Sequence, residues 1–177
     1  GRLFIKYNDH NKPVATQRYD RNGELKRREV YTYDASGRLF EYLVYDAYDA
    51  LESRQVYAYG ANGRDEEVVT YDASGEFESH VESRYDDKAN LIELAHYDAN
   101  GGVVESVTTV YDAMNNILEE RYMAGNDTLL SLKSYTYDDK GLLVELVDDD
   151  RFNDKYSVTC YRYDQKNNLI EEVCYAT

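Results

Sequence analysis

A tyrosine–aspartate pair followed three residues later by glycine or asparagine recurs, exactly or in a close variant, along the whole chain of 177 residues. With the tyrosine as position zero, fourteen turns follow one another at spacings that alternate between 12 and 14 residues. Repeats of fixed length fold as adjoining copies of one small unit. Residues 1–177 are therefore predicted to form a single array of 26-residue repeats, excised from a longer chain. The turns open at residues 7, 19, 33, 45, 59, 71, 85, 97, 111, 123, 137, 149, 163 and 175.

The local chemistry of each turn is that of a β-hairpin. Aspartate opening a type I turn accepts a hydrogen bond from the backbone ahead, and glycine or asparagine supplies the positive φ that closes the turn. Such bulged turns force neighbouring strands to run antiparallel. The predicted fold is all-β, an antiparallel meander of about 13–14 strands in a long twisted or curled sheet. The closing position holds Gly23, Gly37, Gly63, Gly75, Gly101, Asn115, Gly141 and Asn167.

Alternation along each strand predicts how the two faces of the sheet differ. Counted by parity, the turn tyrosines and the apolar residues six positions later, such as Tyr33 and Leu39, lie on one face as a ladder of cross-strand pairs. The next position of the 14-residue half-repeats changes from polar to apolar along the chain, which predicts a sheet that curls or is covered only near its C-terminal end. This series is Lys26, Glu52, Glu78, Val104, Leu130 and Tyr156.

Charge and hydropathy argue against several classes of partner. The net charge is −15, although residues 1–30 hold eight Lys and Arg against four acidic residues and so carry +4. Nucleic acids and anionic membrane surfaces both need basic patches. No apolar run approaches the roughly 20 residues of a membrane-spanning helix. We therefore expect no nucleic-acid partner and no membrane insertion.

The sequence predicts neither catalysis nor a cofactor. The three histidines, His10, His80 and His96, are scattered and share no position of the repeat. The chain contains no zinc-protease, nucleophile-elbow, phosphate-loop or dinucleotide-binding motif. We expect a protein that is not an enzyme.

The recurring turn aspartates are interpreted as turn caps, with a row of calcium sites as the alternative. A calcium ion takes about six to eight oxygen ligands, and each turn offers only one carboxylate. The weak metal candidate is the densest acidic cluster, Asp148, Asp149, Asp150 and Asp154.

Glutamate stands at position eight in six of the seven 12-residue half-repeats, which predicts a row of carboxylates about 9.6 Å apart. One interpretation is a ladder of hydrogen bonds to serines of the adjacent strands, such as Ser53 and Ser131. The alternative is a stripe that binds carbohydrate or peptide beside the tyrosine rings. The candidate ligand-binding residues are Tyr57, Tyr59, Glu67, Glu93 and Glu119, with Phe152 and Tyr156 where the repeat pattern breaks.

The two cysteines, Cys160 and Cys174, flank the turn that opens at Tyr163. Cys160 is predicted to oppose a residue near 172, which makes the two cysteines diagonal neighbours. A disulfide between them would be strained, so two free thiols are favoured.

The units YTYDASGRL (Tyr31–Leu39), YTYDDKGLL (Tyr135–Leu143) and YRYDQKNNL (Tyr161–Leu169) resemble the YD repeats, also called RHS-like repeats, of bacterial surface and toxin-related proteins. The resemblance covers nearly the whole chain. It implies β-hairpins laid side by side in one continuous twisting sheet, which in large family members forms a hollow shell.

The preferred function is a non-catalytic scaffold or interaction module of a bacterial surface or secreted protein, with a protein or glycan as partner. The basic first repeat and the acidic remainder further suggest end-to-end self-association. Two alternatives remain open: a carbohydrate- or peptide-binding module that uses the Tyr/Glu face, and a cytosolic antitoxin-like partner protein.

Overall fold

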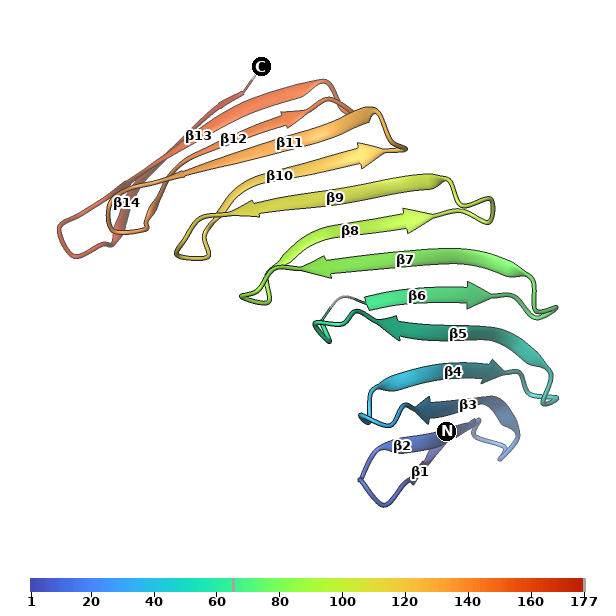
Figure 1. The fold of residues 1–177 in the computed structure, drawn as a ribbon. Helices are drawn as coiled ribbons and strands as arrows, with labels where there is room; N and C mark the ends of the chain where they lie inside the picture. Colours follow the sequence, from blue (N-terminus) through green and yellow to red (C-terminus); the bar gives the residue numbers. More distant parts are fainter. Residues whose placement is uncertain (65, 177) are drawn as a thin grey trace. The chain divides into compact units, whose positions relative to one another are not determined.

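The computed structural model describes residues 1–64 and 66–176, which form strands and turns without a helix. Fourteen strands lie in one antiparallel meander, each hydrogen-bonded to its neighbours in sequence (Figure 1). The prediction of an all-β hairpin meander is confirmed. Within the described residues, no helix is long and apolar enough to cross a membrane. The first seven strands are β1 (Arg2–Tyr7), β2 (Pro13–Tyr19), β3 (Leu25–Tyr33), β4 (Leu39–Tyr45), β5 (Leu51–Tyr59), β6 (Glu66–Tyr71) and β7 (Phe77–Tyr85).

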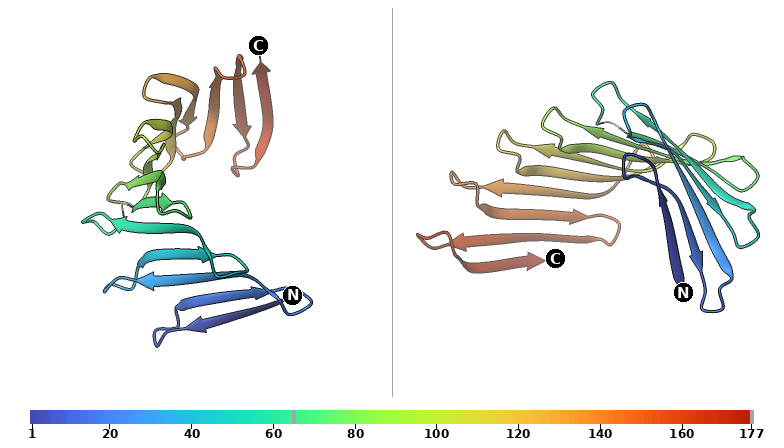
Figure 2. Two further views of the ribbon diagram at one scale, coloured as in Figure 1. Left: turned by 90° about the vertical axis from the view of Figure 1, so that its right-hand side faces the viewer. Right: turned by 90° about the horizontal axis from the view of Figure 1, so that it is seen from below.

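The chain divides into two compact units, which are described separately below. The first unit comprises Gly1–Val81 and Asp98–Gly101, and the second comprises Glu82–Tyr97 and Gly102–Thr177. In the second unit, the strands from β9 onward lie side by side (Figure 2). The remaining strands are β8 (Leu91–Tyr97), β9 (Val103–Tyr111), β10 (Ile117–Ala124), β11 (Thr128–Tyr137), β12 (Leu143–Asp150), β13 (Lys155–Tyr163) and β14 (Leu169–Ala176).

The turn between β3 and β4 has the hydrogen bonds expected of a bulged type I turn. The N–H of Gly37 donates to the carbonyl of Asp34 at 2.9 Å, and the N–H of Asp34 donates to the carbonyl of Arg38 at 2.8 Å. Gly37 has a φ of 77°, a region that side chains disfavour. Ala89 occupies the same turn position with a φ of 69°. The position therefore sets the backbone conformation even where the residue does not favour it.

A second bulge follows most of these turns, and the sequence did not reveal it. Tyr33 pairs with Leu39, but Thr32 pairs with Glu41, so Phe40 has no cross-strand partner. The same shift in register begins strands β2, β3, β5, β9, β10, β11, β12 and β14. One extra residue moves every later side chain to the other face of the sheet.

This bulge corrects the prediction of one uniform tyrosine and leucine face. Most turn tyrosines, such as Tyr33 and Tyr45, do pair with the residue six positions later. However, Glu41 lies opposite Thr32, on the face away from Tyr33, and Tyr45 follows Glu41 by four residues on that same face. The tyrosines of successive turns therefore lie on opposite faces. In the first unit, we call the face of Tyr31 and Tyr33 face one and that of Glu41 and Tyr45 face two.

The same bulge explains the series that changes from polar to apolar. Lys26, Glu52, Val104 and Leu130 are the unpaired bulge residues of their strands. Tyr156 differs, because it pairs with Asp149 in a regular register. Tyr156 therefore does not continue the series. Since Val104 and Tyr156 are 52% and 45% exposed, the structure does not support the prediction of a covered C-terminal end.

Each unit is a single sheet layer with little buried interior. Among the described residues, the most buried side chains are Val44 and Ala95, each 3% exposed, followed by Thr159. This thin core agrees with the low mean hydropathy of −0.75. Cross-strand side-chain pairs, rather than a packed second layer, therefore supply most of the contacts that hold the sheet.

The cysteines lie on opposite faces of the β13–β14 hairpin. Cys160 pairs with Val173, and Cys174 pairs with Thr159, the neighbour of Cys160 in sequence. The predicted partner near residue 172 was thus one residue off. Both thiols are free, as predicted.

Candidate functional site

The turn aspartates accept hydrogen bonds from backbone N–H groups of their own turns. The Oδ1 atom of Asp34 accepts the N–H groups of Ser36 at 2.9 Å and Arg38 at 2.8 Å. The bond from Arg38 is the largest of the causes that lower the pKa of Asp34. The interpretation of these residues as turn caps is confirmed. The same pair of bonds forms at Asp20, Asp46, Asp72, Asp86, Asp112, Asp138 and Asp164.

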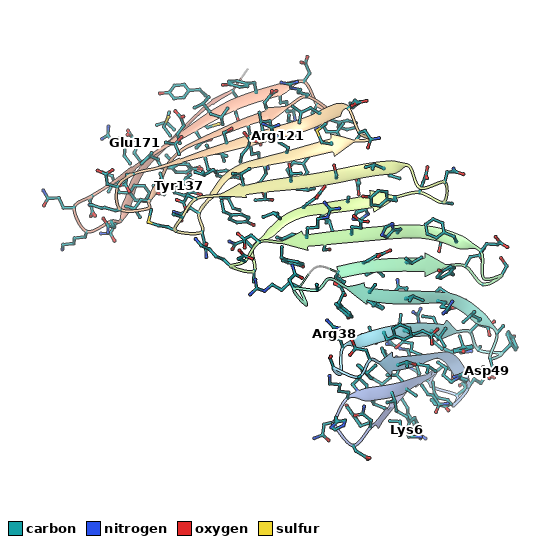
Figure 3. All side chains as sticks on the ribbon, viewed as in Figure 1. Lys6, Arg38, Asp49, Arg121, Tyr137 and Glu171 are labelled. Atoms are coloured by element: carbon teal, nitrogen blue, oxygen red, sulfur yellow. The ribbon has the colours of Figure 1, made fainter. Side chains whose placement is uncertain are left out.

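The second carboxylate oxygen is often used as well. The guanidinium of Arg38 donates to Oδ2 of Asp34 at 2.9 Å, and Figure 3 labels Arg38 in the turn before β4. In later turns an asparagine side chain makes the same contact, as Asn116 does with Asp112. At Asp112 this side-chain bond is the leading cause of a lowered pKa. Such carboxylates have little capacity left for a metal ion.

The tyrosines that open the 12-residue half-repeats have a structural role. The hydroxyl of Tyr59 donates to the carbonyl of Leu39 at 2.8 Å, and Arg38 lies over its ring at 4.4 Å from the centroid. Tyr33 repeats the arrangement with the carbonyl of Pro13 and the ammonium of Lys12. In the second unit, Tyr111 and Tyr163 donate to Leu91 and Leu143 in the same way.

Glu29, on face one of the first unit, is a polar centre that the sequence did not indicate. Its carboxylate accepts hydrogen bonds from Thr16 at 2.7 Å, Tyr31 at 2.8 Å and Arg27 at 2.9 Å. Burial alone would raise the pKa of Glu29, but these donors together with Tyr42 lower it. Burial, followed by the bond to Glu29, raises the pKa of Tyr31 to about 12.

The proposed Tyr/Glu stripe is not one surface. Tyr57 pairs with Val68 and Tyr59 with Glu66, while Glu67 pairs with Ala58 between them. Partners across an antiparallel pair share a face and neighbours along a strand alternate, so Glu67 lies on the face away from both tyrosines. The prediction that these rings and carboxylates form one face is wrong, because the bulges shift the parity on which it was based.

The glutamates of the second unit repeat this separation. Glu93 pairs with Thr108 and Glu119 with Val110, whereas Tyr111 pairs with Ile117 on the other face. In the second unit we call the face of Tyr111 face one and that of Glu93 and Glu119 face two. Binding of a ligand by any of these residues remains a prediction.

Five of the six position-eight glutamates contact a basic side chain rather than a serine. Glu41 contacts Arg54 at 2.7 Å, Glu93 contacts Arg84 at 3.1 Å, and Arg121 contacts Glu119 at 2.5 Å. Glu67 and Glu171 likewise contact His80 and Arg162. Ser53 instead pairs with Val44, so the predicted glutamate–serine ladder is wrong. Figure 3 labels Arg121 on β10 and Glu171 on β14.

The repeat fails at the turn between β12 and β13. Position 149 holds aspartate, and β12 continues to Asp150, which pairs with Lys155 without a bulge. Alternation then directs Asp149 away from the face of Asp148 and Asp150. Asp149 contacts Arg151 at 2.9 Å.

The weak metal candidate is not supported by this arrangement. Both oxygens of Asp150 accept hydrogen bonds from Asn153, the backbone N–H at 3.1 Å and the side-chain amide at 2.7 Å. Asp154 lies in the turn with a φ of 52°. Within residues 1–64 and 66–176, no group of three or more histidine, cysteine or acidic side chains could hold a metal ion.

The two aromatic candidates at this turn face different depressions. Tyr156 lines a shallow hollow of about 330 Å³ with Asp149, Arg151 and Lys155. Phe152 lines another, of about 380 Å³, on the face of Asp148 and Asp150. The structure therefore separates Phe152 and Tyr156, which the sequence had grouped only because both break the pattern.

Comparison with known proteins leaves the family open. No family model and no curated protein matches the chain. Among solved structures, TcdB2-TccC3 without its hypervariable C-terminal region is 16% identical with a TM-score of 0.49, over 98% of this chain and 11% of that chain. The TcdB2-TccC3-Cdc42 complex gives a TM-score of 0.47 at the same identity and coverage. The chain thus spans about a tenth of the length of these structures.

A porin-like protein from Bacteroides uniformis is 12% identical with a TM-score of 0.39, over 98% of this chain and 92% of that chain. At such identities and scores, none of these similarities assigns a function.

Proposed function

We propose that the chain is a non-catalytic scaffold or interaction module built from YD (RHS-like) repeats, and that it belongs to a bacterial surface or secreted protein. Its role is to hold a regular sheet whose non-repeated side chains meet a protein or glycan partner.

One observation supports this proposal: most of the polar residues that repeat already bind other groups within the sheet. Asp34 and its equivalents bind their own turns. The hydroxyls of most tyrosines described above donate to backbone carbonyls, namely those of Tyr33, Tyr59, Tyr111 and Tyr163. The position-eight glutamates Glu41, Glu93 and Glu119 are paired with arginines. A row of catalytic or metal-binding groups would need carboxylates and hydroxyls that are free to act, and most of the repeated ones are not.

The proposal is tested by capture and reconstitution. The chain would be immobilised and exposed to secreted and surface fractions of bacterial cultures, and each captured protein or glycan would then be purified and titrated by calorimetry. We expect saturable binding that survives Asp34→Asn but is lost on substitution of exposed residues between the turns. Absence of any saturable partner, together with turnover in an enzyme screen, would refute a scaffold function.

We further propose self-association of the 177-residue chain, driven by charge. Residues 1–30 carry +4 and the remainder carries −19, since the total is −15. Strand β1 exposes Leu3 and Phe4, and β14 exposes Ile170 beside Glu171. Strand edges with complementary charge and exposed apolar residues favour pairing. Light scattering should show larger species at low salt that dissociate at high salt, and a strict monomer under both conditions would exclude the association.

A further inference from the structure

The depression beside Phe152 is the place where the second unit departs most from its repeat. Cross-strand pairing brings its polar residues together, because Tyr122 pairs with Ser131, Ser131 pairs with Asp150, and Lys133 pairs with Asp148. All of these side chains, with Phe152, line one hollow of about 380 Å³. It therefore combines hydroxyls, two carboxylates, the ammonium of Lys133 and an aromatic ring on one face.

One carboxylate beside this hollow accepts no hydrogen bond within the described residues. The Oδ1 atom of Asp148 is buried and accepts no hydrogen bond. The other oxygen, Oδ2, lies 3.8 Å from the ammonium of Lys133, and the side chain as a whole is 32% exposed. Asp150 differs, because Asn153 satisfies both of its oxygens. No hydrogen bond to Asp148 forms within the described residues. Because Oδ1 is closed to solvent, Oδ2 is the oxygen that a ligand can reach, so Asp148 would gain from a ligand that supplies an N–H group to Oδ2.

Phe152 adds an apolar wall next to this acceptor. Its side chain is 76% exposed, although its backbone N–H is held by the carbonyl of Leu130 at 3.1 Å. The anchored backbone holds the ring beside the hollow, so only its side-chain torsions lose freedom when it is covered. Cations with N–H donors and an apolar stem suit a carboxylate beside an aromatic ring, since the head pairs with the oxygen and the stem or head covers the ring.

We propose that this hollow binds an organic cation of the guanidinium or ammonium class, with Asp148 accepting its N–H and Phe152 covering its apolar stem. The cation is either the side chain of an arginine or lysine in a partner polypeptide or a free amine of the same chemistry. Binding of a cation at this hollow does not depend on the scaffold function proposed above.

The test uses the whole ¹⁵N-labelled chain and four probes observed by NMR. The probes are acetyl-Gly-Arg-Gly-amide, acetyl-Gly-Lys-Gly-amide, their uncharged citrulline analogue, and n-butylguanidinium. We expect saturable shifts confined to the amides of residues 130–133 and 148–153, with the arginine peptide binding at least about tenfold tighter than the citrulline peptide. A preference for the peptide over n-butylguanidinium would identify a polypeptide as the source, and equal binding would identify a free cation.

Two variants and one control separate this site from general attraction to an acidic protein. Asp148→Asn should weaken binding about tenfold, and Phe152→Ala, at an exposed position, should weaken it several-fold. Asp127→Asn removes the same charge from the exposed β10–β11 turn and should leave binding unchanged. Equal loss in the Asp127 variant, undiminished binding in Asp148→Asn, or equal affinity for the citrulline peptide would overturn the proposal.

Discussion

Replacing one turn tyrosine at a time with phenylalanine removes a single hydroxyl and leaves the ring in place. Tyr59 is the best-defined case, because its hydroxyl donates to the carbonyl of Leu39 at 2.8 Å and its ring lies under Arg38. Tyr33 and Tyr163 repeat the bond at 2.7 Å and 2.9 Å in the first and second unit. Tyr137 occupies the same repeat position, but its hydroxyl makes no hydrogen bond within the described residues, which makes it a matched control (Figure 3).

The expected magnitude follows from the bond that is lost. A neutral hydrogen bond in a folded protein contributes about 0.5–1.5 kcal/mol net, because both partners bind water in the unfolded chain. The ring, its cross-strand contacts and the cation above it are unchanged. Tyr59→Phe should therefore lower the free energy of unfolding by about 1 kcal/mol, and Tyr137→Phe should change it by less than about 0.3 kcal/mol.

Urea unfolding followed by circular dichroism measures this difference. With a slope of about 2 kcal/mol per molar urea, a loss of 1 kcal/mol lowers the midpoint by about 0.5 M. Repeat arrays can unfold in parts, so the comparison holds only where the slope stays constant between variants. If Tyr137→Phe cost as much as Tyr59→Phe, the hydrogen bond of the Tyr59 hydroxyl would not be the source of this stability. The turn tyrosines would then stabilise the sheet through the packing of their rings alone.

Three further changes test other parts of the repeat. Ala89→Gly should stabilise the protein by about 0.5–1 kcal/mol in urea unfolding, because glycine adopts the φ of 69° without strain, whereas Ala35→Gly, outside that position, should not stabilise. Glu29→Gln should cost about 1–3 kcal/mol, and Thr16→Val should cost less in that background than in the native chain, as a double-mutant cycle would show. The pKa of Asp72 is lowered from 3.8, with the Ser74 side chain as the leading cause, so its stabilising effect is present above about pH 4 and is lost as the pH falls below that value. Urea midpoints measured from pH 7 to pH 2 should drop less steeply below pH 4 in Asp72→Asn than in the native chain.

The hairpin meander could be predicted because its determinants are local. Asp34 and Gly37 act on backbone groups within five residues, and those groups follow directly from the sequence. The second bulge has no such signature. Its position holds Phe40 in one strand and Glu52 in the next, so neither size nor polarity marks it. If this bulge is not known, counting residues by parity places the position-eight glutamates on the wrong face of the sheet.

The polar centre around Glu29 was hidden for a different reason. Thr16, Tyr31 and Glu29 come from two neighbouring strands, and only the cross-strand register shows that they meet. The repeat gives no warning, because equivalent positions hold other residues, such as Gln55 beside Tyr57. Contacts that depend on register between strands could therefore not be derived once the bulges were missed.

The hollow at Asp148 lies where the repeat is interrupted, and the carboxylate of Asp148 accepts no hydrogen bond there within the described residues. In a regular turn the aspartate after the tyrosine binds backbone N–H groups, as Asp138 binds those of Lys140 and Leu142. At position 149 no tyrosine opens a turn, and the strand runs on to Asp150. Carboxylates at this place therefore belong to a strand whose backbone groups are already paired, and they need other donors. Asn153 supplies them to Asp150, whereas Oδ1 of Asp148 has none. The break in the repeat thus leaves Asp150, at the capping position, bound to Asn153, and places next to it Asp148, which stands before the turn and accepts no hydrogen bond within the described residues.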